Sequence, residues 1–195
     1  GDGMPDLIGG APWTDAFAGT PGAAYLFSGV DGLPLISWIG NKHLSRFGST
    51  VASAGDVNGD GVEDVIVGAP QDSTAGTLAG RAMVFSPVSG GQIHAFLGGN
   101  KMDQFGTSVG GAGDVDGDGT PDLVVGAPYE TTSWLNEGFV HVISGATGGT
   151  ISALAGTALD GRFGSAVAGV GDVNGDTGPE IAIGAPREYS GGYLV

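Results

Sequence analysis

The sequence predicts an all-β fold built from repeated four-stranded antiparallel units, and three observations support this. The chain has 41 glycines among 195 residues without a collagen-like triplet period, which indicates many tight turns. Short apolar segments rich in Val, Ile, Leu and Phe alternate with those turns. Motifs also recur exclusively at one interval of 58 residues, so the chain holds about 3.4 repeats.

Two short motifs mark the repeat. Phe-Gly begins at Phe47, Phe105 and Phe163, and Gly-Ala-Pro begins at Gly10, Gly68, Gly126 and Gly184. Every one of these spacings is 58 residues, so successive units have no net insertion. Self-similarity on this scale is typical of solenoids, propellers and arrays.

Each repeat is expected to supply four strands. The first follows Phe-Gly and contains small residues that suit a crowded inner position. An acidic loop leads to a buried apolar second strand, which Gly-Ala-Pro ends because proline cannot donate to a central ladder. Four antiparallel strands form one blade of a β-propeller. The expected ranges are 47–54 and 105–112, then 65–67 and 123–125, then 24–27, 82–85 and 140–143, and finally 35–39, 92–97 and 150–155.

The repeat predicts one partial propeller over residues 1–195. Residues 1–40 and 157–195 are expected to be incomplete blades, and 41–98 and 99–156 complete ones. The last residues, Tyr193 to Val195, are expected to enter a third strand. Propellers close with about four to eight blades. We therefore expect the remainder of a longer chain, or further copies of this one, to complete a ring of about seven blades or a larger assembly.

A nine-residue acidic loop connects the first and second strands of each unit. Oxygen-bearing side chains at loop positions 1, 3, 5 and 9, with glycines that bend the backbone, are what a hard divalent cation needs, and calcium is the expected one. The side chains are Asp56, Asn58, Asp60 and Asp64; Asp114, Asp116, Asp118 and Asp122; Asp172, Asn174, Asp176 and Glu180; and Asp2 and Asp6 in a fourth copy, of which the sequence contains only the last six residues.

Two other interpretations of these loops fit their residues less well. An EF-hand needs a bidentate Glu at position 12 between two helices, whereas position 12 here is Val67, Val125 or Ile183 in apolar strand sequence. Solvated acidic turns without an ion are the alternative to a metal site, but converging carboxylates repel one another unless a cation neutralises them. We expect the calcium to be structural, because an ion that binds only the folded loop stabilises the fold.

Composition limits the possible partners. The net charge of −15, with six Lys and Arg, argues against nucleic acid and anionic membranes as partners. No apolar run approaches the roughly 20 residues that span a bilayer. The absence of cysteine excludes disulfides and thiolate metal sites. Loops of this kind suit millimolar external calcium, which favours an extracellular or cell-surface location.

Catalytic signals are sparse, and we expect no enzyme. Gly106-Thr-Ser-Val-Gly110 matches the pattern of a hydrolase nucleophile elbow, but such an elbow opens a helix and its repeat counterparts lack the pattern. The histidines His43, His94 and His141 occupy three different repeat positions. Trp13, Trp38, Trp134, Tyr129 and Tyr189 include residues near blade ends, where a sugar- or protein-binding surface is an alternative to ordinary packing.

These motifs together resemble the FG-GAP repeats of integrin α subunits and of many bacterial surface proteins. The resemblance implies a β-propeller whose loops carry Ca²⁺ between the first and second strands. It adds carbonyl ligands at Val62 and Thr120, and the corresponding position of the third loop is Gly178. The third loop departs from the pattern at Thr177-Gly178 and Glu180, so weaker or altered binding is expected there. The opening copy lacks its first two ligands.

Two functional classes follow from the resemblance. The first is a non-catalytic, calcium-stabilised extracellular propeller for adhesion, protein interaction or surface and filament structure. The alternative is an accessory or glycan-binding propeller of a secreted polysaccharide- or lipid-active enzyme. Propellers host many unrelated roles, so the fold alone does not decide between them.

Overall fold

The computed structural model describes residues 4–13, 21–132, 136–190 and 193–194. These residues form β-strands, turns and loops, and no helix lies among them. The same residues therefore include no helix long and apolar enough to cross a membrane. The predicted all-β class is confirmed.

Two four-stranded antiparallel sheets form the middle of the molecule. The strands of each sheet pair in sequence order, as in one propeller blade. The first sheet contains β4 (Thr50–Gly55), β5 (Asp64–Ala69), β6 (Arg81–Phe85) and β7 (Gln92–Leu97), and the second contains β8 (Ser108–Gly113), β9 (Asp122–Ala127), β10 (Phe139–Ile143) and β11 (Thr150–Ala155).

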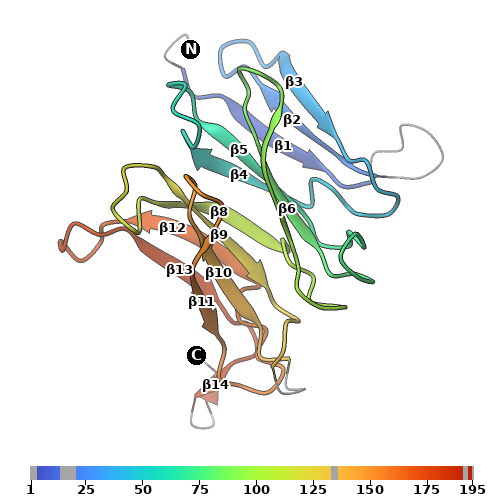
Figure 1. Cartoon of the computed structure of the whole chain (residues 1–195), viewed down its shortest axis with the longest axis vertical. Coiled ribbons are helices and arrows are strands. Elements are labelled where there is room, and N and C mark those ends of the chain that lie inside the picture. Colours follow the sequence, from blue (N-terminus) through green and yellow to red (C-terminus); the bar gives the residue numbers. More distant parts are fainter. Residues whose placement is uncertain (1–3, 14–20, 133–135, 191–192, 195) are drawn as a thin grey trace.

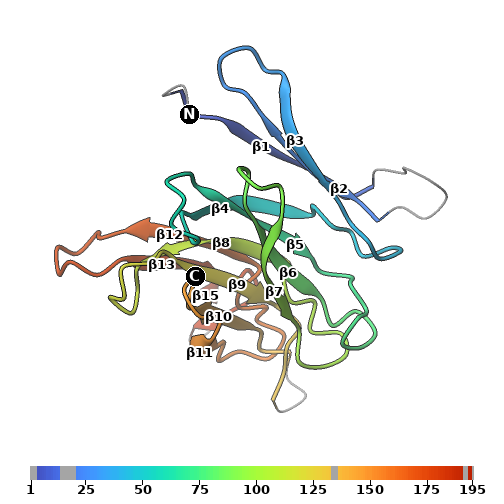
Figure 2. The same cartoon turned by 45° about the horizontal axis from the view of Figure 1, so that its top comes forward.

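Smaller sheets flank these two blades. On one side, β1, β2 and β3 form a three-stranded sheet, and on the other β12 pairs with β13. Figures 1 and 2 show the four sheets following one another from blue to orange in sequence order. The molecule is thus a partial β-propeller. The flanking strands are β1 (Leu7–Ala11), β2 (Ala23–Phe27), β3 (Pro34–Ile39), β12 (Ala166–Gly171) and β13 (Glu180–Gly184).

The expected third strand at the chain end is wrong. Strand β15 (Tyr193–Leu194) pairs with β14 (Tyr189–Ser190) and not with β13. The link is shorter here, because Tyr193 follows Pro186 by 7 positions, whereas Arg81 follows Pro70 by 11. A short link favours a local hairpin over a return along the sheet.

The first strands begin later than expected, at Thr50 and Ser108. The phenylalanines before them are engaged elsewhere: Phe47 forms a parallel bridge with Gly22, and Phe105 forms one with Gly80. Both rings are buried, with 2% and 4% of their surface exposed. The Phe-Gly motif therefore joins one sheet to the preceding sheet instead of opening the strand.

The innermost strands pack closely because their residues are small. Strand β8 lies between β4 and β12. A Cβ atom at Gly111 would lie 3.0 Å from the Ser53 oxygen, and one at Gly169 would lie 2.3 Å from the Gly111 oxygen. The predicted crowding of this position is confirmed, and bulkier residues would force the sheets apart.

The glycines of the two motifs contact each other across sheets. A Cβ atom on Gly126 would lie 2.0 Å from the carbonyl oxygen of Gly164, which belongs to the next Phe-Gly. Gly68 faces Gly106 with a corresponding distance of 2.1 Å, and Gly10 faces Gly48 at 2.0 Å. This contact explains physically why Gly-Ala-Pro and Phe-Gly recur together.

Apolar side chains fill the space between neighbouring sheets. One cluster joins Ile66 and Val84 of the first four-stranded sheet to Leu123 and Val125 of the second. A further cluster lies between the three-stranded sheet and β5 and β6, where Trp38 packs against Phe85 with ring centroids 5.4 Å apart. Burial of these faces supplies the main driving force for stacking the sheets.

Candidate metal centres

A backbone irregularity recurs directly before each acidic loop. The pairing of the first two strands shifts register between Ser53 and Gly55, and the shift recurs at Gly111/Gly113 and Gly169/Gly171. Gly55, Gly113 and Gly171 adopt φ values of 75°, 76° and 68°, which favour glycine. The residue that follows is in each case the first aspartate of the loop.

Backbone N–H groups hold the side chains of each loop inward. In the second loop, Asp114 accepts hydrogen bonds from the N–H groups of Gly117 (2.8 Å) and Gly119 (2.9 Å). Asp116 accepts from Asp118, and Asp122 accepts from Val115 at 2.7 Å. The same pattern recurs in the first loop, at Asp56, Asn58 and Asp64, and in the third, at Asp172, Asn174 and Glu180.

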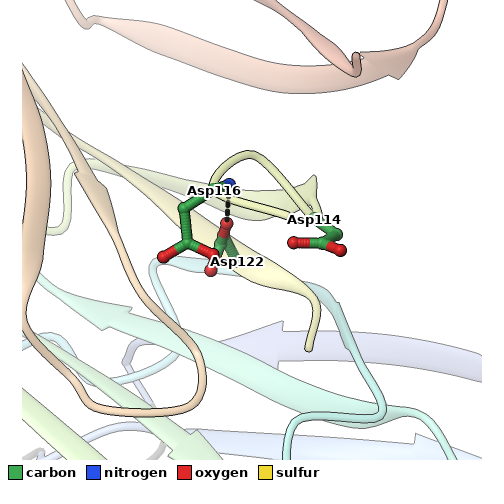
Figure 3. A group of neighbouring side chains, drawn as sticks. All are labelled: Asp114, Asp116 and Asp122. Atoms are coloured by element: carbon green, nitrogen blue, oxygen red, sulfur yellow. Dashed lines mark hydrogen bonds between the residues drawn. The ribbon is translucent and has the colours of Figure 1, made fainter. Parts of the chain in front are cut away.

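Two of these loops bring three carboxylates together. Oxygen atoms of Asp114, Asp116 and Asp122 all lie within 4.8 Å of one another, and so do those of Asp172, Asp176 and Glu180. Figure 3 shows the Asp116 and Asp122 carboxylates side by side, with Asp114 across from them. None of the six Lys and Arg residues lies in these loops. A donor set of converging carboxylates without a cationic neighbour fits a divalent cation.

Some predicted ligands lie outside these groups of three. The Asp118 Oδ1 atom accepts a hydrogen bond from Thr120 N–H at 2.8 Å, and Asp60 likewise accepts from Val62 N–H at 3.0 Å. The second oxygen of Asp60 accepts from the Ser86 hydroxyl at 3.2 Å. Ser86 is not among the residues predicted for the loop, although Ser28, Ser86 and Ser144 share one position of the repeat and could have indicated it.

The last aspartate is buried in both the first and the second loop. Asp64 and Asp122 are both 0% exposed. Burial raises the pKa of Asp64 to about 6, against the opposing effect of the N–H groups of Val57 and Asn58. Burial also raises the pKa of Asp122, where the Gly145 N–H is the strongest opposing influence. A buried carboxylate that resists ionisation gains from a bound cation.

The first and second loops differ in the number of backbone N–H groups that donate to their last aspartate. Gly145 N–H donates to the second oxygen of Asp122 at 3.1 Å, and Gly29 N–H donates to Asp6 at 3.0 Å. The corresponding residue in the first four-stranded sheet is Pro87, which has no N–H. Asp64 therefore has one backbone donor fewer than Asp122.

The third loop is more exposed than the first two. Asp172 and Asp176 are exposed, and Glu180 is half-buried. Thr177 adopts φ 79°, where the second loop has Gly119 at φ 90°. Hydrogen bonds from the N–H groups of Gly175 and Thr177 lower the pKa of Asp172. Of the opening copy, Asp2 lies outside the described residues.

Residues with catalytic patterns have structural contacts. Ser108 lies in strand β8, and its hydroxyl donates to the Gly164 carbonyl at 2.8 Å. The Nε2 atom of His94 lies 2.8 Å from the Gly145 oxygen, and that of His141 lies 2.7 Å from a Glu130 oxygen. His94 lies in strand β7 of the first four-stranded sheet, whereas Ser108 and His141 lie in strands β8 and β10 of the second.

The chain is similar in sequence to a known repeat family and to known proteins. A model of the FG-GAP repeat matches residues 47–94, 105–143 and 163–195. Integrin alpha pat-2 of Caenorhabditis briggsae is 31% identical over 219 residues, covering 100% of this chain and 18% of that protein. Integrin alpha-6 of Gallus gallus is 34% identical over 156 residues, covering 75% and 14%. Integrin alpha-IIb of Mus musculus is 36% identical over 145 residues, covering 65% and 14%.

The chain thus spans less than a fifth of the length of these relatives. The matched segments contain both recurring motifs and the first three strands of each four-stranded sheet. On the agreement of repeat, sheet order and sequence similarity, the chain belongs to the FG-GAP repeat family.

Proposed function

We propose that this chain is part of a non-catalytic, calcium-stabilised propeller that serves adhesion or protein interaction at the cell surface or outside the cell. The observation that carries the proposal is the convergence of Asp114, Asp116 and Asp122 at the end of a buried strand. The similarity to integrin alpha chains supports an interaction role. Further repeat units or further copies of the chain are proposed as structural partners.

Calcium is proposed to act as a structural ion. Each acidic loop joins the first two strands of a sheet, so an ion bound in the loop ties two strands together. Hard carboxylate oxygens suit Ca²⁺, whereas Mg²⁺ demands a smaller and more regular octahedron. An ion bound only by the folded loop stabilises by about 2.7 kcal/mol at a hundredfold excess over Kd.

The proposed ligands are the loop positions that the sequence pattern predicts. The proposed bounds of the blades are those of the 58-residue repeat. Side chains at loop positions 1, 3, 5 and 9 and the carbonyl at position 7 would hold the ion. Residues 41–98 and 99–156 are proposed as complete units and 1–40 and 157–195 as incomplete ones. The proposed set is Asp56, Asn58, Asp60, Val62 and Asp64; Asp114, Asp116, Asp118, Thr120 and Asp122; Asp172, Asn174, Asp176, Gly178 and Glu180; and Asp6 in the opening copy.

Calorimetric titration with calcium tests the proposal, using two variants of the second loop. Asp114→Asn should remove one bound ion per chain, because position 1 is Asp in all three loops. Asp116→Asn is the matched control, since the corresponding residues of the other loops are Asn58 and Asn174. This control should keep the full stoichiometry. Absence of calcium binding by the unaltered chain at millimolar concentration would overturn the proposal.

A further inference from the structure

All Lys and Arg residues of the chain lie at the end of the sheets opposite the acidic loops. The strands alternate in direction, so the connections from second to third strand and from sheet to sheet gather at this opposite end. Backbone hydrogen bonds between these connections, such as Met102 N–H to Thr77 O and Phe47 N–H to Pro21 O, hold them together. The six residues are Lys42, Arg46, Arg81, Lys101, Arg162 and Arg187.

The described carboxylates of this opposite end are buried or already partnered. Asp72, Asp103 and Glu137 are buried, with 2%, 2% and 5% of their surface exposed. The other three form contacts within the chain: Glu130 with His141, Asp160 with Arg162 and Arg187, and Glu188 with Thr157. Among the described residues, cationic groups therefore make up most of the exposed, unpaired charge at this end of a strongly acidic protein.

Two arginines at this end stack on aromatic rings at the same position of the repeat. The guanidinium carbon of Arg46 lies 4.3 Å from the ring centroid of Trp13, and that of Arg162 lies 5.0 Å from that of Tyr129. The middle repeat has Gln104 and Gln71 at the corresponding positions. The stacked pair of an arginine and an aromatic ring is therefore present twice. The repeat between these two copies has two uncharged glutamines instead.

The two stacked pairs differ in their charge balance. Arg162 is paired with Asp160, with an N–O distance of 3.5 Å. In the described part of the chain no carboxylate lies within ion-pair distance of Arg46. The Arg46 Nε atom is buried and has no hydrogen-bond partner there, and Trp13 beside it is 62% exposed. A guanidinium that is fixed by stacking and has no carboxylate partner among the described residues is suited to bind a carboxylate.

We propose that Trp13 and Arg46 anchor an acidic segment of a partner protein. An Asp or Glu side chain of that segment pairs with the Arg46 guanidinium, and the methylene groups of the same side chain lie against the exposed Trp13 ring. Trp and Arg are the residues in which binding energy concentrates at protein interfaces. Lys42, exposed in the same connection, adds long-range attraction.

The charge of the whole chain favours a short acidic segment over a long polyanion. Nucleic acids and sulfated polysaccharides extend far beyond a single anchor and would meet the field of a chain with net charge −15. A protein segment brings its carboxylates only to the cationic end. The inference rests on the proposed function as an interaction domain, and it adds the surface and the chemistry of the partner.

Fluorescence polarisation with a labelled Glu/Gly-repeat peptide tests this inference, with a Gln/Gly-repeat peptide as the neutral comparison. The chain is held in a fixed millimolar calcium concentration. Arg46→Gln and Trp13→Gln are the test variants, because Gln104 and Gln71 occupy those positions in the middle repeat. Gln104 adopts φ 52° and Arg46 φ 55°, so the substitution keeps the backbone. Arg162→Gln and Tyr129→Gln are the matched controls.

The Glu peptide should bind more tightly than the Gln peptide, and added salt should weaken it. Each test variant should lose about tenfold in affinity, as for removal of a hot-spot side chain, while the controls keep theirs. Equal binding of the two peptides, or an equal loss in Arg162→Gln, would overturn the inference. So would a heparin competitor that binds more tightly than the Glu peptide and depends on Arg46. Calcium dependence of stability is measured separately, so failure of the proposed function is recognised independently.

Discussion

The Glu137 carboxylate is buried yet charged. Its Oε1 atom accepts hydrogen bonds from the N–H and hydroxyl of Thr132, at 2.9 and 2.8 Å, and its Oε2 atom accepts from the Thr131 hydroxyl at 2.9 Å. Burial alone would raise the pKa of Glu137, but these hydrogen bonds outweigh it and lower the pKa to about 2. Glu137 therefore stabilises the connection between β9 and β10 in its ionised form.

Replacing Glu137 by Gln should lower the free energy of unfolding at neutral pH by roughly 1–3 kcal/mol, because charge-assisted hydrogen bonds are lost. The folded-state pKa lies below the ordinary value of 4.5. The stabilisation is thus complete above pH 4.5 and is lost as pH falls toward 2. Urea unfolding at several pH values measures this. A deficit of the variant that stays constant from pH 7 to pH 3 would contradict the assignment.

Side chains that recur in all three acidic loops could be recognised from the sequence, whereas contacts that depend on the folding of the connections could not. Loop positions 1, 3, 5 and 9 were recognisable because their oxygen-bearing side chains recur in three units. The hydrogen bonds of Glu137 and the stacking of Arg46 on Trp13 were not, since they depend on how a connection folds over the sheet end. The Pro87 substitution was visible in the sequence, but its effect on Asp64 required the Gly145 hydrogen bond as a reference.

At the scale of elements, the contact between motif glycines holds neighbouring sheets in register. Gly126, the residue before the last of strand β9, lies against Gly164, whose φ of 85° also favours glycine. Gly164 N–H donates to the Gly184 carbonyl at 3.1 Å, which fixes the following strand. A single glycine pair therefore connects the end of one sheet to the start of the next.

Gly126→Ala should destabilise the fold by about 1–3 kcal/mol or more, because overpacking at a backbone contact forces the sheets apart. The new methyl would lie 2.0 Å from a carbonyl oxygen. Gly99→Ala is the control, since its Cβ would meet only a side-chain oxygen at 3.9 Å and its φ is not positive. Chemical denaturation of both variants measures the difference. Equal stabilities would show that the motif glycine is not a packing requirement.

The second acidic loop should bind calcium more tightly than the third. Asp122 is fully buried, whereas Asp172 and Asp176 are exposed and the third loop replaces its final Asp by Glu180. Asp114→Asn should therefore lower the calcium-bound melting temperature more than Asp172→Asn. Scanning fluorimetry in calcium compares them, and the same pair in a chelator controls for the substitution itself. A larger effect of Asp172→Asn would reverse this ranking.

Most strands were predictable because each repeat carries the same apolar pattern. The fourth strands were expected at 92–97 and 150–155 and are observed there. Second strands extend beyond the apolar cores 65–67 and 123–125, because the flanking Asp and Gly-Ala also join the ladders. The last strand was mispredicted where the connection after Pro186 shortens, since composition does not report which pairing a short link permits.

At the scale of the molecule, two kinds of force act on different parts of each sheet. Apolar faces hold the sheets together in a stack, through clusters that include Ile66, Val84 and Leu123. The acidic loops lie at one end, where carboxylates converge. Burial favours the stack without any ion, whereas the loops favour it only when their charge is neutralised. The fold should therefore depend on calcium in proportion to the number of occupied loops.

Thermal unfolding in millimolar calcium, in the same concentration of magnesium, and after chelation measures whether bound calcium stabilises the fold. Each occupied site contributes about 2.7 kcal/mol at a hundredfold excess over Kd, which corresponds to a melting temperature higher by about 5–10 °C for a chain of this size. Chelation should therefore lower the melting temperature, and magnesium should stabilise the chain less than calcium does. An unchanged melting temperature after chelation would show that calcium does not stabilise the fold.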